Sequence, residues 1–214
     1  QLSAERLEMK LGGKLVDPER ALLVKSVRTI VEQVEAMKRL VNEFRDYARL
    51  PAAELRPLDL NALVQNVMQL YPQENAPVRV ALELDERCPP IVGDAEQLRQ
   101  VIHNLLQNAQ DATEAAGRAG DDEAGVVLRT QWQSSSRRVR LAVLDRGTGF
   151  PEHILKRAFE PYVTTKPRGT GLGLAVVKKI ADEHGARVDL SNRLVDGTVV
   201  GAQVSLSFAA HSTA

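Results

Sequence analysis

Two glycine-rich segments, Asp145-Arg-Gly-Thr-Gly149 and Gly169-Thr-Gly-Leu-Gly-Leu174, stand about twenty residues apart in this chain. Together with Asn104 and Asn108 upstream, they supply a carboxylate, two glycine-rich stretches with a conformationally flexible backbone, and two side-chain amides. These are the parts needed to hold a purine nucleotide and its metal. In a Walker P-loop, by contrast, one glycine-rich loop leads directly into Lys and then Ser or Thr. The order found here therefore indicates a different kind of nucleotide pocket.

The first segment follows an apolar run, 139–144, which predicts a strand that ends at Asp145. A carboxylate at a strand end can accept hydrogen bonds from the exocyclic amine of adenine, directly and through water. Gly147 and Gly149 let the backbone approach a flat ring and adopt positive φ. The alternative is an ordinary tight turn, because Asp and Gly are common turn residues.

The second segment opens a helix predicted over 172–184 and ended by Gly185. Backbone amides at a helix N-terminus form an anion site suited to phosphates. Between the glycine clusters, Phe159 is expected to anchor the loop in the core, and Lys166 or Arg168 to reach phosphate oxygens. A flexible hinge and a solvated charged loop remain the alternatives.

The asparagines fall on a helix whose start is marked by a capping box, Asp94-Ala-Glu-Gln97, and which runs to about Ala116. Asn104, Asn108 and Asp111 stand at i, i+4 and i+7, which makes a polar stripe beside the apolar face. An asparagine carbonyl is a hard oxygen ligand suited to Mg²⁺. Alternatively, the amides cap neighbouring loops.

Residues 1–50 lack strand-like alternation, and Asp17-Pro18 is a strong helix start. The apolar residues beyond it follow a 4-3-4-3 spacing: Leu23, Val27, Ile30, Val34, Met37, Val41, Phe44 and Ala48. Such a seven-residue repeat predicts a helical partner in a left-handed bundle, although a generic amphipathic helix has a similar pattern. Residues 2–14 predict a shorter preceding helix, so the two form a hairpin whose first arm is cut short.

Residues 51–57 are predicted to be a linker, because the proline in Leu50-Pro51 disfavours helical geometry in the residue before it. Residues 58–210 then predict a mixed domain. Its further expected elements are a helix at 60–71, strands at 77–84, 126–132, 138–145, 187–192 and 198–208, a polar loop at 117–125 and a mostly mobile loop at 151–171.

Composition limits the partners. Lys+Arg and Asp+Glu both number 28, so nothing global favours nucleic acid or an anionic membrane. The single Cys88 excludes an internal disulfide and fits a reducing compartment. No run of about 18 apolar residues exists to span a bilayer. Because the chain begins at Gln1, inside an expected helix, we expect a soluble cytoplasmic fragment of a longer protein.

Four motifs resemble the N, first glycine, F and second glycine boxes of sensor histidine kinases, in that family's order: 104–109, 145–149, 159–162 and 169–174. Residues 44–51 further resemble the nitrogen-regulation, NtrY/NtrB-like branch. The resemblance implies an α+β fold, in which a helical hairpin precedes a Bergerat-type α/β sandwich: a mixed sheet with helices on one face.

The resemblance also implies ATP and Mg²⁺ as cofactors. Asn108 would hold the metal, Asn104 would touch phosphate or metal, and Asp145 would read adenine. The other residues expected at the nucleotide are Gly147, Gly149, Phe159, Thr165, Lys166, Arg168, Gly169, Thr170, Gly171, Leu172, Gly173 and Leu174.

The chain departs from the family in one important way. Relatives carry the phosphorylated histidine, followed by an acid, on the first hairpin helix. The histidines of this chain are elsewhere, at His103, His153, His184 and His211. No catalytic residue is therefore assigned, and the fragment is expected to bind ATP without phosphorylating itself. Asp111 stands where many relatives carry a cation, so it receives no role.

The implied partners are a response-regulator receiver domain and, through the hairpin of the full-length protein, a second copy of the chain. The parent protein is expected to be anchored in the inner membrane. Two alternative functions remain. One is an ATP-hydrolysing clamp of the gyrase, chaperone or mismatch-repair type, but its general base is a glutamate where this chain has Asn104. The other is a nucleotide-gated interaction module without catalysis.

Overall fold

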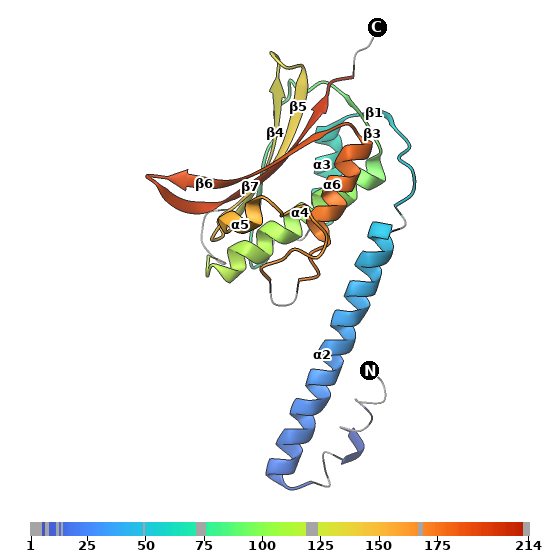
Figure 1. Ribbon diagram of the computed structural model, residues 1–214, viewed down its shortest axis with the longest axis vertical. Coiled ribbons are helices and arrows are strands. Elements are labelled where there is room, and N and C mark those ends of the chain that lie inside the picture. The colour runs from blue at the N-terminus through green and yellow to red at the C-terminus, as the bar shows by residue number, and fades with distance from the viewer. Residues whose placement is uncertain are drawn as a thin grey trace. The chain divides into compact units, whose positions relative to one another are not determined.

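The computed structural model of the chain divides into two compact units (Figure 1). One comprises residues 1–49 with 166–170, and the other comprises 50–165 with 171–214. The residues that the structure describes are 6, 9–11, 13, 15–48, 50–71, 76–118, 124–166 and 169–211. Most of the predicted first hairpin arm, residues 2–14, lies outside them.

The N-terminal unit is built on one long helix, α2 (Asp17–Ala48), with the predicted start and nearly the predicted end. Asp17 in the first turn and Arg45 in the last complement the helix dipole. Several members of the predicted apolar seam are at least half exposed, namely Ile30, Met37, Val41 and Phe44. Val27 of the same seam is buried, so the part that is open to a partner helix lies between Ile30 and Phe44.

The larger unit contains a five-stranded sheet in the order β2-β4-β5-β7-β6. Its strands are β2 (Val80–Glu83), β4 (Val126–Gln133), β5 (Arg138–Asp145), β6 (Arg187–Val195) and β7 (Thr198–Ala209). β2 pairs with β4 in parallel and the other pairs are antiparallel, so the predicted mixed sheet is confirmed. A second small sheet pairs β1 (Arg56–Leu58) with β3 (Ile91–Gly93), neither of which had been predicted.

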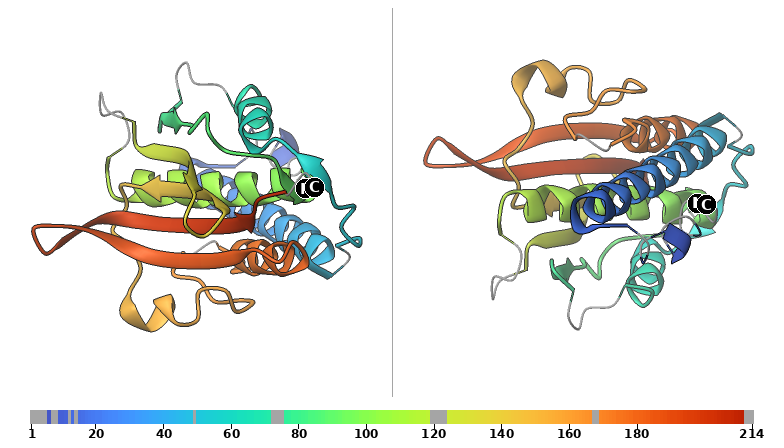
Figure 2. Two further views of the ribbon diagram at one scale, coloured as in Figure 1. Left: turned by 90° about the horizontal axis from the view of Figure 1, so that it is seen from above. Right: turned by 90° about the horizontal axis from the view of Figure 1, so that it is seen from below.

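Three helices, α3 (Leu60–Met68), α4 (Ala95–Ala115) and α6 (Gly173–Glu183), lie on one face of the main sheet. The left view of Figure 2 shows α4 passing behind the strands. The apolar face predicted for this helix is buried as expected at Leu98, Val101, Ile102, Leu105, Leu106 and Ala109. Among the described residues, no helix combines the length and apolar character that crossing a bilayer requires.

Some helices and strands end at other residues than the sequence predicted, because turns interrupt or join them. The helix predicted over 60–71 ends at Met68, and a short helix, α5 (Glu152–Leu155), occupies part of the predicted loop at 151–171. Strand β6 extends to Val195, beyond its predicted end at 192, because Asp196 and Gly197, with φ of 49° and 78°, close a two-residue hairpin to β7.

The predicted helix start at Asp94 is confirmed, because its Oδ1 atom accepts the amides of Glu96 at 2.9 Å and Gln97 at 3.1 Å. Its Oδ2 atom accepts the amide of Glu54 at 2.8 Å. Burial raises the pKa of Asp94, but these three backbone hydrogen bonds outweigh it and lower the pKa overall. The Gln97 side chain meanwhile donates to the Pro51 carbonyl at 2.9 Å. The predicted linker is thus bonded to the start of α4.

Candidate nucleotide-binding site

Asp145 ends β5 with its side chain buried, only 7% of the residue being exposed. Its Oδ1 atom accepts the amide of Gly147 at 2.8 Å and the amide of Ala202 at 2.9 Å. Hydrogen bonds from amides to a carboxylate are charge-assisted and directional. The carboxylate is therefore held in one orientation by its own turn and by the neighbouring strand β7.

Two glycines let the backbone close around Asp145. A methyl group on Gly147 would stand 2.8 Å from Cβ of Ala112, so the loop after β5 packs directly on α4. A methyl group on Gly201 would stand 1.9 Å from the carbonyl oxygen of Asp145, and its φ of 153° also favours glycine. Both positions require the absence of a side chain.

The second glycine segment turns the chain into α6. Gly171 has a φ of 72°, and its carbonyl accepts the amide of Tyr162 at 3.0 Å. Leu172 is fully buried at the N-cap and provides no side-chain cap. By contrast, Asp59 and Asp94 cap α3 and α4. The first turn of α6 thus lacks the side-chain cap that its neighbours have, which suits an anionic ligand.

The N-terminus of α6 meets α4 at Asn108, because a methyl group on Gly173 would lie 3.5 Å from Nδ2 of Asn108. Gly147 meets the same helix at Ala112. Residues four apart lie on one face and about 6 Å apart along a helix axis. The two glycine segments therefore approach one face of α4 on successive turns, and half-buried Asn104 lies one turn further on.

The described residues contain no cluster of three or more His, Cys, Asp or Glu side chains able to hold a metal. Asp111 accepts a hydrogen bond at 2.8 Å from Gln107 on the same helix, consistent with the absence of an assigned role. A cation bound here would instead use an amide oxygen together with water and phosphate. That set suits Mg²⁺, which takes few protein ligands when it bridges phosphates.

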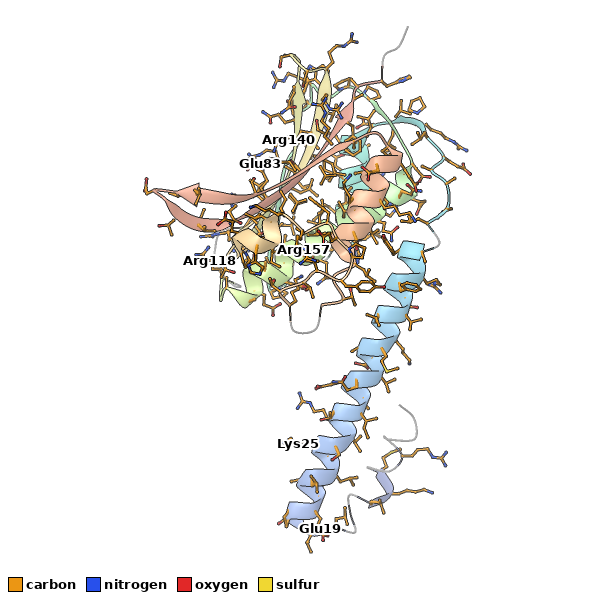
Figure 3. The ribbon with its side chains drawn as sticks, viewed as in Figure 1. Glu19, Lys25, Glu83, Arg118, Arg140 and Arg157 are labelled. Carbon is orange, nitrogen blue, oxygen red and sulfur yellow. The ribbon has the colours of Figure 1, made fainter. Side chains whose placement is uncertain are left out.

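Four residues that hold the loop after β5 in place were not predicted from the sequence: Thr113, Arg118, Arg193 and Asn192. Thr113 is fully buried, and its hydroxyl accepts the amide of Arg146 at 3.3 Å. Arg118, labelled in Figure 3, donates to the carbonyl of Arg146 at 2.7 Å. Arg193 donates to the carbonyl of Asp145 at 2.7 Å. These residues fix the chain at and just after the end of β5.

Asn192 supports the far end of the same loop. It accepts the amide of Phe150 at 2.7 Å and donates to the Phe150 carbonyl at 2.8 Å. The glycine inside β7, Gly201, was the available sequence signal, because a glycine within a strand often marks a close backbone approach.

The remaining predicted residues have different placements. Phe159, the expected anchor of the loop, is partly buried, and Ala158 beside it is buried, with 2% exposure. Thr165 is exposed, and Leu174 is partly buried. Lys166, Gly169 and Thr170 group with the N-terminal unit, so the site is built without them. Arg168 lies outside the described residues.

A separate hollow of about 430 Å³ lies over β2 and β4 and contains none of the predicted site residues. It is lined by Glu83, Leu84, Asp85, Arg129, Thr130 and Gln131. Among these residues, Asp85 has its pKa lowered, chiefly by hydrogen bonds from Arg87. This hollow is not continuous with the site on α4 that the glycine segments define.

The sequence pattern of the histidine kinase-, DNA gyrase B-, and HSP90-like ATPase family matches residues 93–209. The chain belongs to this family, and those residues form its ATP-binding domain. The match spans β3 to β7, including Asp145 and both glycine segments. The predicted Bergerat-type architecture and the sensor histidine kinase resemblance are confirmed.

The chain is also similar to individual sensor kinases. It is 31% identical over 205 residues to the putative NtrY-like sensor histidine kinase of Rickettsia bellii, a match covering 96% of this chain and 32% of the relative. It thus spans about a third of that protein's length.

Two solved structures share the fold. Full-length ShkA in complex with AMPPNP has a TM-score of 0.67 at 27% identity, covering 99% of this chain and 46% of that one. Histidine kinase ThkA in complex with the response regulator TrrA has a TM-score of 0.68 at 25% identity, covering 96% and 56%.

Proposed function

We propose that this chain is the catalytic region of an NtrY-like sensor kinase, which transfers the γ-phosphate of ATP to a histidine. Residues 58–210 would form the catalytic domain, residues 51–57 the linker and residues 1–50 part of the dimerisation hairpin. One observation carries the proposal: both glycine segments reach the same face of α4, at Ala112 and at Asn108.

The adenine end of the site is assigned to Asp145. Its Oδ1 atom accepts hydrogen bonds from two amides, which orient the carboxylate that is assigned to the exocyclic amine of adenine. Gly147 and Gly149 would line the ring, because neither places a side chain over it. An acceptor at this point favours adenine over guanine, whose corresponding position is a carbonyl oxygen.

The phosphate end is assigned to the first turn of α6, the segment from Gly171 to Leu174. Its backbone amides and helix dipole favour negative charge. Asn108, beside Gly173, would hold Mg²⁺ through its side-chain oxygen, and Asn104 would contact phosphate or metal. Bound Mg²⁺ would neutralise charge on the phosphate oxygens. Phe159, Thr165, Lys166, Arg168, Gly169 and Thr170 keep the assignment to the nucleotide that the family resemblance implies.

The arrangement favours phosphate delivery over ATP hydrolysis. Phosphoryl transfer depends mainly on positioning and on charge stabilisation. Hydrolysis by the related clamp ATPases needs a glutamate to activate water, and the corresponding position here is Asn104, whose amide cannot act as a base.

The acceptor is assigned to another histidine-bearing segment, because the histidines of this chain are unsuited to that role. The ring of His184 is held at both nitrogens, by the carbonyl of Ile180 at 2.8 Å and the amide of Asp94 at 2.9 Å. His103 is hydrogen-bonded to Tyr71, and His153 lies on the four-residue helix α5. Self-phosphorylation of this chain is therefore not expected.

Two partners complete the proposal. The exposed seam of α2 supports dimerisation through a helical bundle in the full-length protein, which we expect to be anchored in the inner membrane. The complex of ThkA with TrrA supports a response-regulator receiver domain as the final phosphate acceptor.

The proposal is tested with radiolabelled ATP, Mg²⁺ and a separately produced hairpin of an NtrY-like kinase that retains its histidine. We expect acid-labile label on the hairpin and none on this chain. An Asp145→Asn variant serves as the control and should transfer much less label when the ATP concentration is below saturation. Acid-labile labelling of this chain itself, or release of inorganic phosphate without any labelled hairpin, would contradict the proposal.

A further inference from the structure

The face of the main sheet opposite α4 is covered by no other described element of its unit (Figure 2). Side chains alternate along each strand, and Val126, Leu128 and Thr130 are buried toward the helices. The paired register therefore assigns the alternate positions to the open face. Its charged residues are Arg129, Arg138, Arg140, Arg187 and Arg193, with the acids Glu83 and Asp189.

Three of these arginines gather around one serine. Ser207 on β7 is paired in register with Arg140 on β5 and with Arg187 on β6. Directly paired residues lie about 5 Å apart across a sheet. Arg138 joins them, because its Nε donates to the Ser207 hydroxyl at 3.0 Å and its Nη2 to the Ser207 carbonyl.

Two of the three arginines, Arg138 and Arg140, are held in place by hydrogen bonds. Arg140 donates to the Ser205 hydroxyl at 2.9 Å, and Ser205 is itself buried, with 3% exposure. Guanidiniums fixed on a rigid sheet lose little entropy on binding a carboxylate, which they can hold through two parallel hydrogen bonds. Figure 3 labels Arg140 on this part of the sheet.

The cluster lacks matching negative charge. Asp189 stands 3.9 Å from Arg140 and is mostly exposed, so it screens that arginine weakly. Arg187 has no partner among the described residues. Burial, and then the nearby charge of Arg187, lower the pKa of Arg138. The three cations therefore repel one another, and an acidic ligand would relieve that repulsion.

We propose that Arg138, Arg140 and Arg187 form a docking site for an acidic segment of a protein partner, whose carboxylates pair with the guanidiniums beside Ser205 and Ser207. Nucleic acid fits less well. The chain has no net positive charge, Glu83 and Asp189 would repel a continuous phosphate backbone, and the described open face presents no aromatic side chain for base stacking. This site is separate from the nucleotide site.

The test measures binding of a labelled oligoglutamate peptide to the full chain by fluorescence anisotropy at low salt. The double variant Arg140→Gln, Arg187→Gln should bind the peptide about tenfold more weakly, because each lost ion pair costs about threefold in affinity. A matched variant, Arg28→Gln with Arg56→Gln, removes two exposed arginines elsewhere and should change affinity less than about twofold.

The single variant Arg187→Gln should lower the affinity for the peptide about threefold. Because Arg187 is exposed and has no described partner, this variant should fold even if the double variant does not. Amide NMR shifts on titration should concentrate at Ser205 and Ser207. The proposal would be overturned by equal losses in the two double variants, or by binding no stronger than that of an oligoglutamine peptide. Preferential binding of single-stranded DNA or phosphatidylserine vesicles would also overturn it.

Discussion

The Oδ1 atom of Asp145 accepts the backbone amide of Ala202 at 2.9 Å, although the two residues stand 57 positions apart in the chain. The same oxygen accepts the amide of Gly147 within its own turn, at 2.8 Å. A local and a long-range bond thus set the carboxylate before any ligand arrives. Groups that are held in their binding orientation lose less entropy when a ligand binds.

Gly201→Ala should destabilise the fold strongly, because the new methyl would stand 1.9 Å from the Asp145 carbonyl oxygen and only a backbone shift could relieve the clash. We expect a loss of at least about 3 kcal/mol in the free energy of unfolding, measured by urea denaturation. Gly197→Ala is the control: its φ is also positive, but no atom lies within 4 Å, so its cost should be about 1 kcal/mol. Equal losses would show that the close approach is not a constraint.

Gly173→Ala should separate binding from stability. Its methyl would make an ordinary contact with Asn108, at 3.5 Å, and alanine favours helix by up to about 1 kcal/mol over glycine. Thermal unfolding should therefore be unchanged or shifted upward. The same methyl would intrude between the start of α6 and Asn108, so ATP affinity should fall about tenfold, or about 1.4 kcal/mol. Unchanged affinity by calorimetry would argue against phosphate binding at this turn.

Asp94→Ala removes the cap of α4 and the bond to Glu54. At pH 7 we expect a loss of about 1–2 kcal/mol in the free energy of unfolding. Folding lowers the pKa of Asp94 from its ordinary value of 3.8, so the charged carboxylate stabilises the fold above that pH. This contribution disappears as the pH falls toward the folded-state pKa.

The difference in stability between the native chain and the Asp94→Ala variant should therefore narrow below about pH 4. Denaturation curves at a series of acidic pH values measure it. A difference that stays constant down to the lowest pH at which both chains fold would show that the carboxylate acts without its charge.

Asn108→Ala should weaken ATP binding about tenfold in the presence of Mg²⁺ and much less in its absence, because the lost group is an assigned metal ligand. Gln107→Ala is the neighbouring control, since Gln107 is exposed and bonds to Asp111. Titrations with and without EDTA make the comparison. The same loss under both conditions would remove Asn108 from the metal site.

Features specified by neighbouring residues could be predicted from the sequence. The N-cap residue Asp94 predicted the start of α4 correctly, although Gln97 does not complete the predicted capping box, because the amide of Asp94 bonds to His184. An apolar run predicted β5 with both boundaries correct. Asn104, Asn108 and Asp145 became candidates through their helical spacing and their position at a strand end, and their assigned roles stay predictions. Each of these patterns lies within a few residues and needs no knowledge of the tertiary fold.

The supports of the site could not be predicted in this way. Arg118, Asn192 and Arg193 bond to backbone groups that only the finished sheet brings near them. Gly201 is required because β7 passes over the end of β5, a contact between distant parts of the chain. The burial of Ala158 in the turn after α5 likewise depends on packing that no local pattern announces.

Calorimetric titration of an Asp145→Asn variant with a non-hydrolysable ATP analogue and Mg²⁺ tests the assigned nucleotide site most directly. Asparagine can keep the hydrogen bonds from Gly147 and Ala202 through its oxygen, but it places an amide donor where adenine offers another donor. The variant should remain folded and bind at least about thirtyfold more weakly, a loss of about 2 kcal/mol or more. A folded variant that binds the analogue as tightly as the native chain would contradict the assignment.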